Sequence, residues 1–381
     1  MGKEALQALK PRVFAIISGI LLFYSALVFF VGWNIWIWLN TLFSLEHAGI
    51  YTIVIGVIAY SYLLGRLHVR LAPLKIIGSY WFAVVQYGAI LFPLADLLVL
   101  LLQLFSVPTE KSVFWVGIFL LISFIGIFLR GTWNAWNPIV RKYELSIPKR
   151  AGSYKQLRIA MASDIHLGWI VGKSHLQRLI REVDALRPDI MLLPGDVLDD
   201  DIEPFIRKNM ASVMKNLRAP LGVYAILGNH EYIGGKIPEY LKQMEAIDVR
   251  VLVDETIKID DSFYLIGRKD RAAGERKSLE ELLVDVDPGA PLIVMDHQPY
   301  HLEVAARNGI DLMLSGHTHR GQLAPNHLIT RRIFELDWGY KQKRQLHAIV
   351  SSGFGFWGPP LRLGSRSELI QIDITFTSQA E

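Results

Sequence analysis

The sequence LRIAMASDIH at residues 157–166 shows the pattern that decides the fold of the larger part of the chain. A short apolar run, typical of a buried strand, ends in a carboxylate and an imidazole two positions apart. Residues two apart on an extended chain point to the same side, so Asp164 and His166 can bind one cation. Similar motifs follow other apolar runs: MLLPGD at 191–196, VYAILGNHE at 223–231, LIVMDH at 292–297 and LMLSGHTH at 312–319.

Apolar runs that suit buried strands alternate with amphipathic stretches that suit helices from residue 157 onward. The clearest helical candidates are residues 174–186, 204–217 and 238–247, and the last strand candidate is 369–375. This alternation predicts a layered α/β fold. In open α/β sheets the active site lies beyond the carboxyl ends of the strands, which is where the polar motifs stand.

Each motif is weak evidence by itself, because a lone Gly-Asp is usually a turn and a lone histidine is usually structural. Here five motifs follow five apolar runs in order, and they contain five of the eleven histidines. A glycine precedes Asp196, Asn229 and His317, which lets the backbone turn sharply and approach a bound ion. The combination therefore predicts a metal site.

The order Asp-x-His, Gly-Asp, Gly-Asn-His-Glu, His and Gly-His-x-His resembles the motifs of the calcineurin-like metallophosphoesterase superfamily. The resemblance covers about residues 150–375. The sequences SSG at 351–353 and GPPLR at 358–362 resemble the membrane-anchored bacterial branch. The resemblance implies a four-layer α/β/β/α sandwich and two metal ions that share one carboxylate.

The resemblance also implies a role for individual residues of this sequence. The residues that would bind the first ion are Asp164, His166, Asp196 and His319. The residues that would bind the second ion are Asp196, Asn229, His297 and His317, so Asp196 would bridge the two ions. His230 would not bind metal; it would stabilise the transition state or protonate the leaving oxygen. Asp196 and His230 are therefore the expected catalytic residues.

Carboxylate, imidazole and amide ligands suit Mn²⁺, Fe or Zn²⁺, and of these we expect two Mn²⁺ ions. The absence of cysteine excludes disulfides, thiolate metal sites and cysteine nucleophiles. Two cations about 3.5–4 Å apart bind a phosphate from both sides and activate water for in-line attack. The expected reaction is the hydrolysis of a phosphodiester, pyrophosphate or phosphomonoester without a covalent intermediate.

Several residues beside the motifs allow two interpretations each. Glu231 either supports the ligands or caps a helix. Arg320 either binds a substrate phosphate or is a solvated loop residue. The three aspartates at 199–201 are expected to cap the following helix rather than to bind metal. Asp296 differs from the residue that many relatives have there, although His297 is in place.

The N-terminal third has a different composition. Residues 13–129 contain only seven of the chain's 40 Lys and Arg and 36 Asp and Glu. Four apolar stretches, at 13–31, 48–65, 79–105 and 113–129, are long enough to cross about 30 Å of hydrocarbon. They lack the polar faces of amphipathic core helices, and the first is too long for a cleaved signal peptide. We therefore expect four transmembrane helices.

Asp96 lies inside the third apolar stretch, three residues after Pro93. A carboxylate within a membrane span costs about 2.5–3.5 kcal/mol on insertion scales, so it usually has a partner or a function. The alternative is that the span is shifted and Asp96 lies near its end.

Lys and Arg are concentrated before the first span, between the second and third, and after the fourth. By the positive-inside rule, both termini and the polar domain should face the cytoplasm. The charges behind this expectation are Lys3, Lys10, Arg12, Arg66, Arg70, Lys75, Arg130, Arg141, Lys142, Lys149 and Arg150. Residues 137–155 should form a basic juxtamembrane linker on anionic lipid, or a solvated charge run. The expected divisions are thus a transmembrane domain at 1–136, this linker, and a metallophosphoesterase domain at 156–381.

Together these features predict a multi-pass protein of the cell membrane with a dinuclear phosphoesterase site at the cytoplasmic face. Its expected partners are the lipid bilayer and a phosphorylated, lipid-linked substrate. A net charge of only +4 gives no reason to expect nucleic acid. The aromatic residues of FGFW at 354–357 either contact lipid or form a packed turn. The alternatives are a hydrolase of soluble nucleotide phosphoesters, and a membrane sensor, transporter or scaffold that uses the domain for binding.

Overall fold

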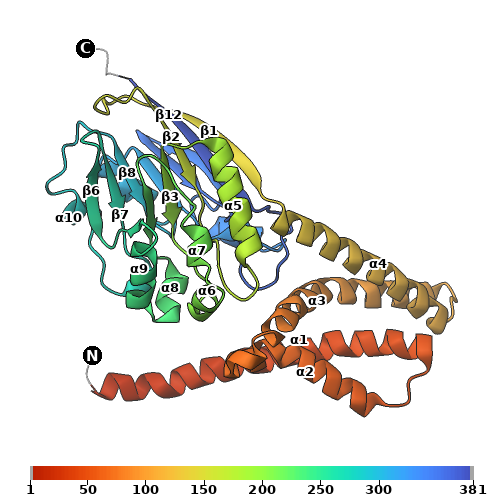
Figure 1. The fold of residues 1–381 in the computed structure, drawn as a ribbon. Coiled ribbons are helices and arrows are strands. Elements are labelled where there is room, and N and C mark those ends of the chain that lie inside the picture. Colours follow the sequence, from red (N-terminus) through yellow and green to blue (C-terminus); the bar gives the residue numbers. More distant parts are fainter. Residues whose placement is uncertain (1–2, 378–381) are drawn as a thin grey trace. The chain divides into compact units, whose positions relative to one another are not determined.

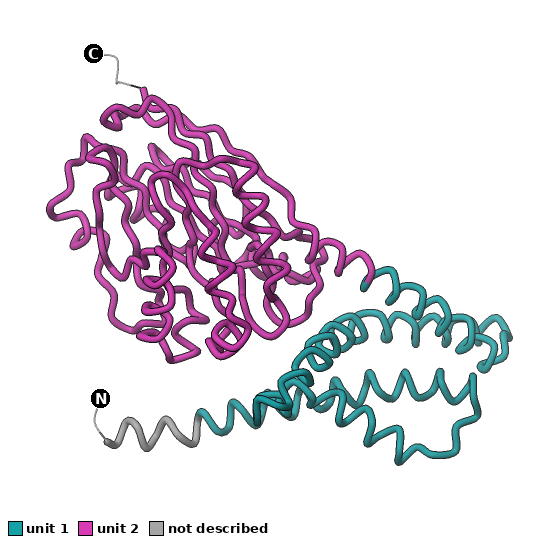
Figure 2. Tube along the Cα trace, in the orientation of Figure 1, with its two compact units in different colours: residues 1–128 teal, residues 129–381 magenta. Residues whose placement is uncertain are grey.

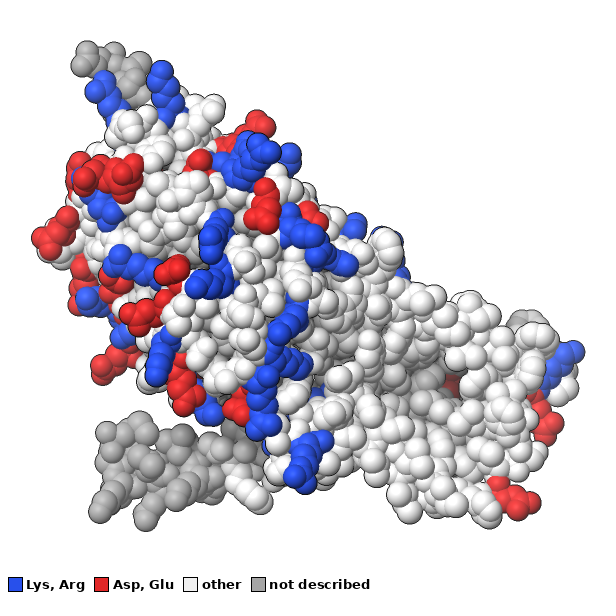
Figure 3. Space-filling model, in the orientation of Figure 1, with Lys and Arg blue, Asp and Glu red and all other residues white. Residues whose placement is uncertain are grey.

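The computed structural model describes residues 3–377, with side chains described from residue 13 onward. The chain divides into two compact units, Met1–Phe128 and Leu129–Glu381 (Figure 2). Figure 3 shows that charged side chains are sparse on the first unit and frequent on the second. Each unit has its own hydrophobic core.

Unit 1 consists of helices that form from the apolar stretches. They are α1 (Lys3–Phe43), α2 (Ala48–Leu67), a short 3₁₀ helix η1 (Val69–Leu71), α3 (Leu74–Leu104) and most of α4 (Thr109–Trp136). As expected, the four long helices are long and apolar enough to cross a membrane, α1 from Val13 on. The side chains of Lys3, Lys10 and Arg12, which contribute to the expected orientation, lie outside the described ones.

Asp96 lies eight residues before the end of α3, so it is inside the helix and not at its end. It lines a cavity of about 770 Å³ in unit 1, together with Asn34, Trp38 and apolar side chains of α1, α3 and α4. The carboxylate and the Asn34 amide are the main polar groups in an otherwise apolar lining.

Unit 2 contains two six-stranded sheets, with the strand orders β1-β12-β2-β3-β4-β5 and β10-β11-β9-β8-β7-β6. The strands of the first sheet are β1 (Ile139–Ile147), β2 (Gln156–Met161), β3 (Ile190–Pro194), β4 (Val223–Ile226), β5 (Val249–Val251) and β12 (Glu368–Phe376). The strands of the second are β6 (Glu255–Ile259), β7 (Phe263–Gly267), β8 (Leu292–Met295), β9 (Leu312–Ser315), β10 (Gly339–Lys343) and β11 (Leu346–Val350).

The two sheets pack face to face, and helices cover their outer faces (Figure 1). In β2, Ile159 and Met161 point into the core between the sheets, whereas Ala160 points to the helix-covered face. The helices are α5 (Lys173–Leu186), α6 (Glu203–Arg207), α7 (Ala211–Met214), α8 (Asn229–Gly234), α9 (Ile237–Glu245), η2 (Arg271–Ala273), α10 (Leu279–Leu282), α11 (Leu302–Arg307), η3 (His319–Gly321) and α12 (His327–Ile333). The predicted four-layer α/β/β/α sandwich, preceded by four apolar helices, is therefore confirmed.

Residues 139–147 lie in the stretch expected to be a linker, yet they form the edge strand β1. This strand pairs in parallel with β12 along all nine of its residues. Leu145 and Ile147 are buried, whereas Lys142, Glu144 and Ser146, which alternate with them on the other side of the strand, are exposed. Lys142 and Glu144, two charged residues of the expected linker, thus stand on the exposed side of a strand, where charged residues also discourage pairing with other chains. Arg141 stands on the other side and forms an ion pair with the buried Glu368.

Candidate metal centre

The loops that follow β2, β3 and β9 hold several polar residues in left-handed backbone conformations. Non-glycine residues in this conformation cost about 1–3 kcal/mol each and persist only where the surrounding structure enforces them. In this chain the residues are Asp164, His166, Asp196, His317 and His319, and their φ angles lie between 47° and 71°. Such strain is concentrated at functional sites, and here it aims the side chains of three loops at one place.

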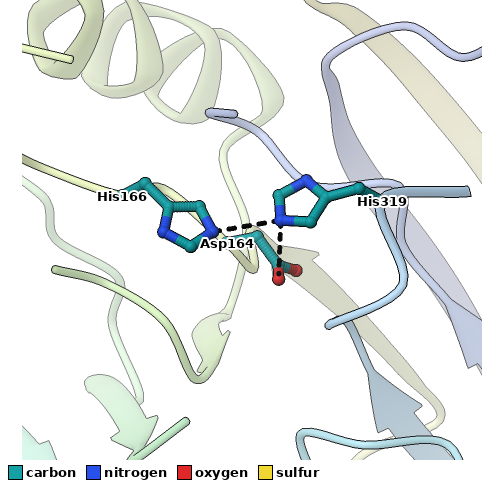
Figure 4. A group of neighbouring side chains, drawn as sticks. All are labelled: Asp164, His166 and His319. Carbon is teal, nitrogen blue, oxygen red and sulfur yellow. Dashed lines mark hydrogen bonds and ion pairs between the residues drawn. The ribbon is translucent and has the colours of Figure 1, made fainter. Parts of the chain in front are cut away.

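Asp164, His166 and His319 form the first of two clusters (Figure 4). The Nε2 atoms of His166 and His319 lie 3.0 Å apart, and Oδ1 of Asp164 lies 3.5 Å from Nε2 of His319. The backbone N–H of His317 donates to the Asp164 carboxylate at 2.9 Å. Burial holds the pKa of the His166 and His319 rings well below the usual value of histidine. Both rings are therefore neutral and can offer lone pairs to a cation.

Asp196, Asn229, His297 and His317 form the second cluster, at the ends of β3, β4, β8 and β9. Nε2 of His297 lies 3.0 Å from Oδ2 of Asp196 and 3.2 Å from Oδ1 of Asn229. The same Asn229 oxygen lies 2.8 Å from Nδ1 of His317. The Nδ1–H of His297 donates to the carbonyl oxygen of Pro194 at 2.8 Å, which leaves Nε2 to face the cluster.

The electrostatics of the two clusters suit bound cations. Burial raises the pKa of the Asp164 carboxyl to about 6, because its charge is poorly solvated. Burial also disfavours a charged His297, but the Asp196 carboxylate outweighs it and raises the His297 pKa well above its usual value. The site therefore attracts positive charge. Two carboxylates, an amide oxygen and four imidazoles form a donor set that fits Mn²⁺, Fe or Zn²⁺.

Glu231 holds the loop that carries Asp196. Its carboxylate accepts hydrogen bonds from the backbone N–H groups of Asp196 (3.1 Å), Leu198 (2.9 Å) and Gly228 (2.7 Å). Burial raises the pKa of Glu231 to about 8. Both interpretations of Glu231 thus apply, since it caps α8 at Gly228 and also fixes the loop of a ligand.

His230 lies at the edge of the first cluster, where its ring centroid is 4.6 Å from that of His166. Its Nδ1 lies 2.7 Å from Oδ1 of Asp200, and its backbone N–H donates to Oδ1 of Asp196 at 2.9 Å. Asp199 lies near the same ring, with Oδ1 3.8 Å from Nδ1. The site thus brings His230 together with the ligand-type residues, as the sequence predicted.

The three aspartates at 199–201 do not share one role. Asp201 caps the start of α6, because its Oδ1 accepts from the backbone N–H of Glu203 at 3.0 Å. Asp200 instead pairs with His230, which sequence reasoning missed. Asp199 forms a third group of possible ligands with His166 and His230. No spacing rule in the sequence distinguishes these three neighbours.

Arg362 is a second residue whose part in the site the sequence did not reveal. Its guanidinium is fully buried, and one N–H of Nη2 points at Nδ1 of His319 at 3.1 Å. The same group donates to the carbonyl oxygens of Gly355 (2.6 Å) and Gly353 (3.3 Å). The GPPLR motif contains this arginine, but nothing in the motif indicates its contact with the candidate ligand His319.

Arg320 and Asp296 flank the clusters but turn away from them. The Arg320 guanidinium stacks on the ring of Trp338, 3.9 Å from its centroid. The residue is half-buried, and its Nε is buried without a hydrogen-bond partner in the described part of the chain. Asp296 forms ion pairs with Arg268 (2.8 Å) and Arg276 (2.6 Å). These pairs fix the strand end from which His297 points to the second cluster.

The chain resembles known proteins over a large part of its length. The sequence profile of a family described as calcineurin-like phosphoesterase matches residues 157–321. A protein of Aquifex aeolicus named uncharacterized metallophosphoesterase is 33% identical over 243 residues, which make up 62% of this chain and 91% of that one.

The names of two further relatives mention a membrane or a substrate. A Bos taurus protein named transmembrane protein with metallophosphoesterase domain is 32% identical over 253 residues, 62% of this chain and 56% of the relative. The chain thus spans little more than half the length of that relative. UDP-2,3-diacylglucosamine pyrophosphatase LpxG of Chlamydia trachomatis is 23% identical over 233 residues, 49% of this chain and 70% of the relative.

Proposed function

The chain belongs to the calcineurin-like metallophosphoesterase family, and we propose that it hydrolyses a lipid-linked phosphodiester or pyrophosphate at the cytoplasmic face of the cell membrane. The observation that carries this proposal is the convergence of seven ligand-type side chains in one buried centre. They occur in a chain that also has four helices able to cross a membrane.

In this proposal Asp164, His166, Asp196 and His319 would hold the first metal ion. Asn229, His297 and His317 would hold the second, and Asp196 would contribute to both. Support comes from the distances within each cluster, which bring the nitrogen and oxygen atoms of ligand-type side chains to within hydrogen-bonding distance of one another. The ions would polarise the phosphate and lower the pKa of a nearby water, and Mn²⁺ is the expected metal.

His230 acts as a hydrogen-bond donor to the reacting phosphate or as the acid for the leaving oxygen. Its Nδ1–H is directed at Asp200, so its Nε2–H is the donor that remains for the substrate. Asp200 keeps the ring charged and oriented, and is therefore a positioning residue. Arg320 remains a candidate for binding a substrate phosphate, because a guanidinium stacked on an aromatic ring keeps the N–H groups in its own plane available.

The lipid-linked substrate is supported by two observations. Four apolar helices tie the protein to a bilayer, where an anchored enzyme meets lipids at high effective concentration. The Chlamydia relative is named for a pyrophosphatase of a diacylated sugar nucleotide, which is a lipid with a phosphoanhydride bond. The cytoplasmic orientation is supported by the Lys and Arg of the loops, by the positive-inside rule.

The test uses the purified full-length protein with Mn²⁺ and three substrates: an aryl phosphodiester, a fractionated membrane-lipid extract and a set of free nucleotides. We expect metal-dependent cleavage of the aryl ester and of a lipid fraction. Cleavage of nucleotides alone would reject the lipid linkage. A reporter active only outside the cytoplasm should stay silent after Arg150 and be active near Glu46, and the reverse result would overturn the orientation.

A further inference from the structure

Helix α12 exposes an unusual amount of apolar surface for a helix of seven residues. Leu328 is 51% exposed, Ile329 58% and Ile333 54%, and they share the helix surface with the exposed Arg331 and Arg332. By comparison, α6, α8 and α11 each expose one large apolar side chain. Clustered apolar side chains beside arginines are typical of helices that lie in the headgroup region of a membrane.

The segments that flank α12 connect it to candidate metal ligands. The short helix η3, which begins with His319, precedes α12 by only a few residues. Phe334, directly after α12, contacts the ring of His317 with a centroid distance of 6.0 Å. The helix is thus attached at both ends to candidate metal ligands.

Trp357 is a further exposed apolar side chain near the centre. It is 50% exposed, whereas its neighbours Phe354 and Phe356 are buried in the core. Its ring centroid lies 6.2 Å from that of His230. Gln322 fixes its backbone, since Gln322 donates to its carbonyl oxygen at 2.7 Å and accepts from its N–H at 3.1 Å. We call Leu328, Ile329, Ile333 and Trp357 the apolar rim.

The apolar rim is also linked to the end of a candidate membrane span. Ala324 donates to the carbonyl oxygen of Leu363 at 2.8 Å, and Arg362 donates to the carbonyl oxygen of Gly131 at 2.9 Å. Gly131 lies in the last turns of α4, which are part of unit 2, and the nearby Trp133 is 56% exposed. The segment that leads into α12 is therefore held two hydrogen-bonded steps from a helix that reaches the membrane surface.

We propose that the apolar rim inserts into the headgroup region of an anionic bilayer, so that a lipid phosphoester reaches the metal centre without leaving the membrane. Arg331 and Arg332 contact anionic headgroups, and the aliphatic side chains and Trp357 contact the upper part of the acyl chains. This inference rests on the proposed function, because it names the surface that would present a lipid substrate to the site.

The absence of cysteine makes a direct test possible in the full chain. A nitroxide is attached at Ile329→Cys, and the protein is reconstituted in vesicles of phosphatidylethanolamine and phosphatidylglycerol. Val284→Cys is the matched control, because Val284 is 76% exposed in unit 2 and lies outside the apolar rim. We expect the label at 329 to collide mainly with oxygen, which concentrates in lipid, and the label at 284 mainly with a water-soluble nickel complex.

Equal exposure of both labels to the nickel complex would overturn the proposal. A label at 329 that neither reagent reaches would also overturn it, since this result indicates a second copy or a protein partner over α12. Replacing phosphatidylglycerol with phosphatidylcholine should reduce the oxygen collisions at 329, and unchanged collisions would reject the role of the arginines. These measurements detect insertion and do not require turnover, so they remain informative if the proposed function fails.

A kinetic measurement tests the consequence for catalysis. In Ile329→Ser with Ile333→Ser, the rate on a lipid substrate in vesicles, divided by the rate on a soluble aryl phosphodiester, should fall about tenfold. The ratio should not change in Val284→Ser. An unchanged ratio in the double variant would show that the apolar rim does not deliver substrate.

Discussion

Nδ1 of His230 lies 2.7 Å from Oδ1 of Asp200, at the edge of the candidate metal centre. Burial by itself would favour the neutral ring, but the hydrogen bond to Asp200 and the charges of Asp196 and Asp199 outweigh it and raise the His230 pKa to about 9. At neutral pH the ring is therefore a cation whose orientation is set by a residue 30 positions away in the sequence.

The change Asp200→Asn should lower kcat by about tenfold or more while the bound metal is kept, because His230 loses its charge partner and part of its orientation. An amide stabilises the imidazolium less than a carboxylate does, so the pH at which kcat declines on the alkaline side should shift to lower values. The measurements are a pH profile of kcat and metal analysis of the purified protein. Asp201→Asn is the control, since Asp201 caps α6; identical profiles for both variants would contradict the role of Asp200.

Chelation should abolish hydrolysis by the wild-type protein, and added Mn²⁺ should restore it. Asp196→Asn should lose activity by roughly a thousandfold even with excess Mn²⁺, because one carboxylate would serve both ions and their combined effect is several kcal/mol. The wild-type Tm should also fall on chelation, since bound metal stabilises the folded state. A variant at 196 that keeps wild-type turnover would remove the proposed bridging role.

Most strands of unit 2 could be predicted, because buried parallel strands are short apolar runs with polar residues after them. The apolar run of the MLLPGD motif at 191–196, for example, lies in β3 (Ile190–Pro194). The helix expected at 204–217 is instead two short helices, α6 and α7. Asn209 between them has a left-handed φ of 46°, and Lys208 turns back to donate to the carbonyl oxygens of Gly168 and Trp169. Long-range contacts of this kind leave no periodic pattern in the sequence.

The residues of the candidate site also differ in whether local sequence or only the fold reveals them. The ligand-type residues follow apolar runs, so their positions could be predicted from local sequence. Asp200 and Arg362 act through partners 30 and 43 positions away, and only the fold brings these pairs together. Edge strand β1 was missed for another reason: its alternation of apolar and charged residues is short and partly hidden by its high charge.

Arg362→Met should destabilise the protein by about 3 kcal/mol, because the carbonyl oxygen of Gly355 would lose both N–H groups that donate to it in a fully buried place. The change also removes the N–H that points at His319, so we expect less bound metal per chain. Thermal unfolding and metal analysis measure both effects. Arg207→Met is the control, because Arg207 forms only an exposed pair with Glu203. Equal Tm values for the two variants would contradict the structural role of Arg362.

A chain that begins at Leu129 should fold and hydrolyse a soluble aryl phosphodiester, whereas one that begins at Ser153 should not fold. The shorter chain begins near the end of the linker expected at 137–155, so by that expectation it would be a complete domain. It lacks β1, however, and with it the nine-residue pairing with β12. It also lacks Arg141, whose Nε lies 2.9 Å from the buried carboxylate of Glu368.

An unpaired Glu368 would be costly, because its side chain is only 1% exposed, and losing one partner of a buried ion pair costs about 3–5 kcal/mol. The last turn of α4 adds a further contact, since Asn134 donates to the carbonyl oxygen of Arg362 at 3.0 Å. Circular dichroism, thermal unfolding and aryl phosphodiester hydrolysis compare the two chains. The variant Arg141→Met in the longer chain removes the ion pair but keeps strand β1. It should lower Tm without preventing folding. If the chain from Ser153 were as stable and active as the chain from Leu129, residues 137–152 would be a dispensable linker, and β1 would contribute nothing to the sheet.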